Sequence, residues 1–196
     1  MKLLAPLLLL IFSSSFGQTI NYQNLLNTAL KGHGSLFLCS KPLKISQLNP
    51  KEMWLYVENL RAYSAQRLDT TMFSQIIQNS LIADTTLWTD NELQNFILVN
   101  ERAETVSKRY VIQKFKLTDK KEVKHLNKYI NKFNSTDPVN RVVCYYSRPV
   151  YDNSKTFAVV QWDNGHSHLR GGGGIKLYHL QGETWKEIGD ILHWRY

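Results

Sequence analysis

The residues best suited to bind a ligand or catalyse a reaction form one polar segment near the C-terminus, between two apolar stretches. In an extended backbone, His166 and His168 face the same side. Successive glycines let a ligand approach the backbone, and their N–H groups can cradle phosphate, sulfate, carboxylate or a sugar. The candidate binding residues are His166, His168, Arg170, Gly171, Gly172, Gly173 and Gly174.

Two catalytic patterns are incomplete in this segment. His166 and His168, with Asp163 nearby, offer zinc ligands, but two histidines from one loop do not close a zinc site. Gly165-His166-Ser167-His168-Leu169 approaches the nucleophile motif G-x-S-x-G and departs from it at Leu169. The glycines are also not followed by the Lys-Ser/Thr of a nucleotide-binding loop. The sequence therefore predicts no metal and no cofactor.

Two other interpretations of the segment stay open. His166 and His168 are suited to act as acid and base in a secreted hydrolase resembling a phosphodiesterase or nuclease, with Arg170 holding the phosphate. Alternatively the glycines are structural, and they allow a bulge or let Trp162 or Trp194 pack over bare backbone.

The elements that position this segment differ before and after Pro138. Helix starts are indicated by the N-cap residues Asn49, Asp69 and Asp119, and Thr89 with Glu92 forms a further capping pair. Short strands are expected at 35–39 and 96–99, and residues 110–112 fit either a strand or a helix. After Pro138 we expect strands at 141–146, 156–162, 175–180 and 185–196.

These patterns predict one α+β domain, in which N-terminal helices pack on a C-terminal antiparallel β-meander. Both faces of the strand at 156–162 are apolar, so this strand should be central and covered on both sides. The helix that starts at Asp119 has an apolar stripe of Val123, Leu126, Ile130 and Phe133. Lysines fill its other positions, as a solvated face or as an anion-binding face.

The N-terminus predicts the compartment. Residues 1–17 combine Lys2, an apolar run and small residues before Gly17, the pattern of a cleaved signal peptide. The expected mature domain is 18–196, periplasmic or secreted, with no integral membrane segment. The net charge is +8 for the whole chain and +7 once Lys2 is removed with residues 1–17, which fits an anionic ligand, a polysaccharide or an acidic protein as partner. Cys39 and Cys144 are a candidate disulfide in such a compartment, or else two buried free thiols.

The last quarter of the chain resembles a loose group of exported bacterial proteins. The resemblance rests on Ser147-Arg148-Pro149-Val150-Tyr151, the apolar strand at 157–160, the glycine run, and the Gly182, Trp185 and Trp194 that follow. It implies an extracytoplasmic β-rich end and carries no activity with it. Many members have cysteines in the glycine-rich loop and this chain has none there, so a loop disulfide does not transfer.

The function expected from the sequence is that of a non-catalytic exported domain that binds a ligand or partner near His166–Gly174. The alternative is the secreted hydrolase that uses His166 and His168.

Overall fold

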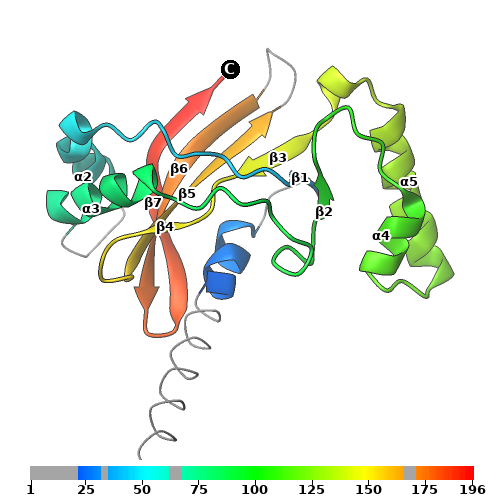
Figure 1. Cartoon of the computed structure of the whole chain (residues 1–196), viewed down its shortest axis with the longest axis horizontal. Coiled ribbons are helices and arrows are strands. Elements are labelled where there is room, and N and C mark those ends of the chain that lie inside the picture. Colours follow the sequence, from blue (N-terminus) through cyan, green and yellow to red (C-terminus); the bar gives the residue numbers. More distant parts are fainter. Residues whose placement is uncertain (1–21, 32–34, 62–67, 166–170) are drawn as a thin grey trace, which may run out of the picture.

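The fold is built on one mixed β-sheet (Figure 1). The computed structural model describes residues 22–31, 35–61, 68–165 and 171–196. Its seven-stranded sheet runs in the order β2-β1-β3-β5-β6-β7, and β4 pairs with β5. The strands are β1 (Phe37–Cys39), β2 (Ile97–Val99), β3 (Val143–Tyr146), β4 (Val150–Tyr151), β5 (Phe157–Gly165), β6 (Gly171–Gln181) and β7 (Thr184–Arg195).

The helices lie mostly in the N-terminal two thirds of the chain. A first helix covers 22–29. The others are the 3-10 turn η1 (Pro50–Glu52), α2 (Met53–Arg61), α3 (Thr70–Leu81), α4 (Lys108–Lys114), α5 (Lys120–Ser135) and the 3-10 turn η2 (Pro138–Asn140). The predicted α+β class, with helices packed on a C-terminal meander, is therefore confirmed.

The predicted helix starts are confirmed where a side chain accepts a hydrogen bond from the first turn. Asn49 accepts from the Lys51 N–H at the start of η1, and Asp69 accepts from Met72 N–H at the start of α3. Asp119 accepts from two backbone N–H groups at the start of α5. The pair Thr89 and Glu92 bonds reciprocally as a capping box does, but it closes a turn and no helix follows.

Both faces of the meander are covered, as predicted for β5. Val159 belongs to a cluster that includes Phe73 of α3 and Tyr56 of α2, whereas Ala158 and Val160 face the opposite cluster, which includes the helix 22–29. This alternation follows from the two-residue period of a strand. The first helix and the α2–α3 pair therefore sandwich the meander from opposite sides.

A third apolar cluster joins α4 and α5 to the short strands β1 and β2. Ile130 and Phe133 of α5 pack with Phe37, Cys39 and other side chains of that part of the sheet. The rings of Phe37 and Phe133 stack with their centroids 3.9 Å apart. The pair α4–α5 thus lies beside the β2 edge, away from α2 and α3 (Figure 1).

Two expectations need correction or completion. The sheet is not wholly antiparallel, because β1 pairs in parallel with both β2 and β3. Parallel neighbours need a long crossover, which α2 and α3 supply between β1 and β2. Residues 110–112, which fit either a strand or a helix, belong to α4.

The expected signal segment 1–17 lies outside the described residues. Among the residues that are described, no helix is both long and apolar enough to cross a bilayer. The prediction of export therefore stays a prediction.

Candidate functional site

The glycine run lies within a strand and not in a loop. Gly171 to Gly174 form the first four positions of β6, paired with β5 on one side and, from Gly172 onward, with β7 on the other. Gly173 and Gly174 are buried. The strand expected at 175–180 therefore begins earlier than predicted, because the ladder continues through these four residues, which the sequence placed outside the strand.

Close packing of two tryptophans explains why glycine is needed there. A Cβ on Gly173 would lie 2.5 Å from a ring carbon of Trp194, its partner on β7. A Cβ on Gly174 would lie 3.1 Å from the indole nitrogen of Trp162 and 2.7 Å from the Leu192 carbonyl oxygen. The two indoles belong to the clusters on opposite faces of the sheet. The structural interpretation of these glycines is thus supported.

The remaining residues of the predicted site, His166, His168 and Arg170, lie outside the described residues. Neither the binding interpretation nor the hydrolase interpretation is tested by a described contact, and both stay predictions. Asp163, the carboxylate next to this segment, accepts a hydrogen bond from the Tyr196 hydroxyl at 2.7 Å. No group of three or more metal-ligating side chains occurs within the described part of the chain.

The candidate disulfide between Cys39 and Cys144 is absent, and both thiols are free and buried. Cys144 is in register with Leu38, so Cys39 is one position further along β1. A shift of one residue turns the side chain to the other face of the sheet. Cys39 accordingly packs in the α5 cluster and Cys144 in the cluster of the first helix. The alternative of two buried thiols is the one observed, and burial raises the pKa of Cys144 to about 11.

A large hollow lies between α5 and one end of the sheet. At this end β1 and β3 begin and β5 ends. The hollow has a volume of about 1420 Å³. We call it the α5 groove. Its apolar lining is Leu36, Phe37, Phe115, Leu117, Leu126, Tyr129, Phe133 and Val142. At the sheet end, Cys144 and Asn164 complete it, so the predicted polar segment at His166 begins two residues beyond its lining.

The groove exists because α5 is longer than the strands it covers. Ile130 and Phe133, in the C-terminal half of the helix, are buried against the sheet. Val123 and Leu126, in the N-terminal half, are only partly buried, and Tyr129 is half exposed. The apolar stripe therefore extends past the sheet and forms one wall of the hollow.

The charged side chains of the α5 groove are mostly basic. They are Lys121, Glu122, Lys132 and Arg141, with His125 between the two ends. Arg141 is only 5% exposed and donates to the carbonyl oxygens of Asn134, Thr136, Arg102 and Glu104 at 2.7 to 2.9 Å. No carboxylate in the described ranges forms an ion pair with it.

This pattern gives Arg141 a structural role. Its carbonyl partners include the orphan acceptors at the C-terminus of α5, where a cation is favourable. Its guanidinium also lies 4.9 Å from the centre of the Phe133 ring in the groove wall. Arg141 therefore fixes the end of α5 against the sheet and leaves a positive charge beside the groove.

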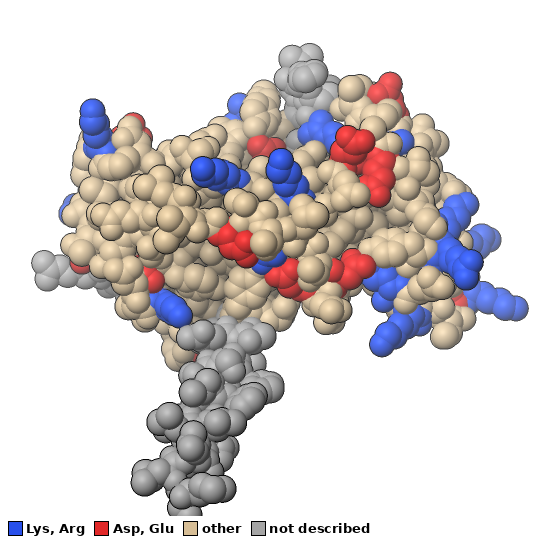
Figure 2. Space-filling model, in the orientation of Figure 1, with Lys and Arg blue, Asp and Glu red and all other residues tan. Residues whose placement is uncertain are grey.

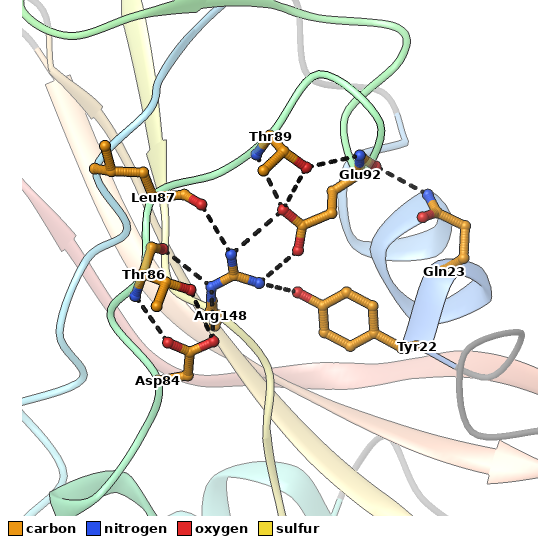
Figure 3. Close-up of polar contacts among 8 residues, drawn as sticks. All are labelled: Tyr22, Gln23, Asp84, Thr86, Leu87, Thr89, Glu92 and Arg148. Carbon is orange, nitrogen blue, oxygen red and sulfur yellow. Dashed lines mark hydrogen bonds and ion pairs between the residues drawn. The ribbon is translucent and has the colours of Figure 1, made fainter. Parts of the chain in front are cut away.

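A second buried arginine, Arg148, ties three distant segments of the chain together (Figure 3). Arg148 donates to both oxygens of Glu92, at 2.6 and 3.3 Å, and to the Tyr22 hydroxyl at 2.7 Å. It also donates to the carbonyls of Thr86 and Leu87, and its guanidinium lies 4.4 Å from the centre of the Trp88 ring.

The charges around Arg148 shift several pKa values. Burial raises the pKa of Glu92, but hydrogen bonds from Arg148 and Thr89 outweigh burial and leave it below its usual range. Burial, reinforced by the charge of Glu92, raises the pKa of Tyr22 to about 12 against the lowering effect of Arg148. The three guanidinium nitrogens of Arg148 all donate to partners inside the protein, so we assign this network a structural role.

Sequence reasoning missed the α5 groove. The available signal was the apolar stripe of α5 together with Phe115 and Leu117 just before the helix. That signal shows a helix with a buried side, but it does not show that the sheet ends before the helix does.

No protein-family model matches this chain, and no curated protein or solved structure is similar to it. The resemblance of its last quarter to exported bacterial proteins therefore stays a prediction.

Proposed function

We propose that this domain binds a small, mainly apolar ligand in the α5 groove and holds it without catalysis. The observation that carries the proposal is a preformed hollow of about 1420 Å³ whose lining surface is mostly apolar. Ligand pockets in proteins are typically about 300–1,000 Å³ and mostly apolar, with a few polar groups. The α5 groove is larger than this range, so it has room for such a ligand, and its lining is of the same mostly apolar kind.

The cost of leaving this lining in water supports the same conclusion. Burying apolar surface stabilises by roughly 25 cal/mol per Å², so an empty groove forgoes that gain along α5. Contiguous exposed apolar surface in a soluble protein commonly marks a binding site. Tyr129 is 50% exposed and could have been polar without loss of the sheet contacts, which Ile130 and Phe133 make.

The neutral fluorescent probe N-phenyl-1-naphthylamine tests the proposal, because its emission rises when it leaves water. We expect saturable binding to the purified protein. Leu126→Lys should weaken it about tenfold, since it replaces part of an apolar wall with a charge, a loss near 1.4 kcal/mol. Tyr129→Lys should act in the same direction, and it changes a residue that is already 50% exposed.

Leu81→Lys is the matched control, because Leu81 is 72% exposed on α3 and the change in charge is the same. Far-UV circular dichroism should show that all three variants are folded. Absence of probe binding to the wild type, or equal affinities for Leu126→Lys, Tyr129→Lys and Leu81→Lys, would refute the proposal.

We also propose, from residues 1–17, that the protein acts after export. N-terminal sequencing of the protein from its producing cells should then begin at Gln18. A chain that retains Met1 in a soluble cytosolic fraction would contradict export.

A further inference from the structure

The α5 groove borders a second hollow that is lined by lysines. This hollow, of about 770 Å³, lies on the outer side of the N-terminal half of α5. We call it the lysine hollow. Lys120, Lys121, Lys124, His125 and Lys128 supply its basic lining. Lys121 and His125 also line the α5 groove, so the two hollows meet at these side chains.

The charge across this boundary is one-sided. No carboxylate lines the lysine hollow, and Glu122 is the one carboxylate among the residues that line the α5 groove. None of the four lysines of the hollow takes part in a salt bridge with a described carboxylate. Figure 2 shows Lys and Arg side chains gathered at the end of the molecule where Figure 1 places α4 and α5. A negative charge placed there meets attraction and little repulsion.

The orientation of α5 places its apolar side chains on one side of the helix and its lysines on the other. Its stripe of Leu126, Tyr129 and Phe133 faces the groove, whereas Lys124 and Lys128 are exposed on the other side. A helix that lies on a membrane must present its apolar side outward to the lipid. In α5 that side is turned toward the protein, which favours a single molecule entering the groove over a lipid surface.

We infer that the ligand is a single-chain anionic amphiphile with a carboxylate or phosphate head. Its tail lies along the α5 groove, and its head lies over the boundary at Lys121 and reaches into the lysine hollow. The groove runs along α5 from Lys121 to Lys132, about 16 Å at the rise of an α-helix, which is long enough for an extended alkyl chain. This inference rests on the proposed function and adds the charge and the shape of the ligand.

The experiment compares three ligands that share a twelve-carbon tail and differ in their head group. Dodecanoate, dodecyl phosphate and the neutral dodecanol are each titrated, below the concentrations at which they aggregate, against protein loaded with N-phenyl-1-naphthylamine. The apparent affinity from probe displacement should be at least fivefold higher for both anionic compounds than for dodecanol. This preference should shrink in high salt, because salt screens exposed charges.

The double variant Lys124→Gln/Lys128→Gln removes charge from the lysine hollow alone. It should reduce the preference for the anionic heads several-fold and leave the affinity for dodecanol unchanged. The control Lys51→Gln/Lys186→Gln lowers the net charge equally at exposed sites on η1 and β7, and it should leave the preference intact.

The outcomes separate the two proposals. Equal affinities for dodecanol and the anionic compounds would overturn the inference while the α5 groove stayed a binding site. An equal effect of both double variants would overturn it as well, because the attraction would then come from the overall charge. Binding to anionic vesicles without binding of the monomeric compounds would also overturn it. If the probe does not bind, so that no compound can displace it, the proposed function itself would be overturned.

Discussion

Replacing Arg148 with methionine should destabilise this fold much more than the same replacement at an exposed ion pair. Arg148 is 9% exposed and connects β3–β4 to the helix 22–29 and to the segment 84–92 (Figure 3). Methionine keeps much of the aliphatic volume of the side chain and removes its donors. The variant therefore isolates the polar contribution.

The structure sets the expected magnitude. Removing one partner of a buried ion pair costs about 3–5 kcal/mol, because the other charge is left poorly solvated. The Glu92 side chain is 24% exposed and retains some contact with water, so we expect a loss near the lower end, about 3 kcal/mol. The pair Arg61–Glu58, with side chains 73% and 58% exposed, should contribute less than about 1 kcal/mol.

Urea unfolding followed by far-UV circular dichroism measures both variants. Tryptophan emission is a poor probe here, because the Trp88 ring lies under the guanidinium of Arg148. A double-mutant cycle with Glu92→Gln should return a coupling of about 1.5–3 kcal/mol, the range for hydrogen bonds to charged groups. The reasoning is refuted if Arg148→Met and Arg61→Met lower the free energy of unfolding equally, at unchanged denaturant slope.

Three further predictions concern pH, the glycine strand and the thiols. Because the pKa of Glu92 is lowered in the folded state, its contribution to stability is present above the ordinary value of 4.5 and is lost as pH falls below it. Acid titration of the free energy of unfolding should show this loss, and a profile that Glu92→Gln leaves unchanged would contradict it. Gly173→Ala should cost about 1–3 kcal/mol in thermal or urea unfolding, because the new Cβ meets the Trp194 ring at 2.5 Å and the Trp162 carbonyl oxygen at 2.7 Å; an unaltered midpoint would contradict this close packing. Cys39 and Cys144 should react with an alkylating reagent only after denaturation, and reductant should leave the melting temperature unchanged; a disulfide-linked mass would contradict the observed strand register.

Several features of this fold are readable from neighbouring residues. The caps at Asn49, Asp69 and Asp119 are predicted because a side-chain oxygen and the N–H groups it accepts from are two or three residues apart. The central position of β5 is predicted because alternate residues face opposite sides of a strand and both sets are apolar. Gly182 lies between the strands expected at 175–180 and 185–196, and its φ of 63° suits glycine.

The motif Ser147-Arg148-Pro149-Val150-Tyr151 shows where local reading ends. The resemblance to exported bacterial proteins rests partly on this motif, but the sequence does not show that Arg148 reaches Tyr22 and Glu92, far away along the chain. Ser147 similarly accepts from the backbone N–H of Gln161 on the neighbouring strand β5. These partners are set by strand order, which no local pattern contains.

The sequence by itself determined the class of the fold, the helix starts and the alternation of the meander, since each depends on spacings of a few residues. Only the tertiary structure decided that β1 pairs in parallel with β2 and β3, that the two cysteines face opposite sides, and that four glycines continue a strand beneath two tryptophans. It also decided that α5 extends past the sheet and leaves a groove. The physical reason is that register and coverage are relations between segments distant in the chain, and a shift of one residue or one helical turn changes them without changing any local propensity.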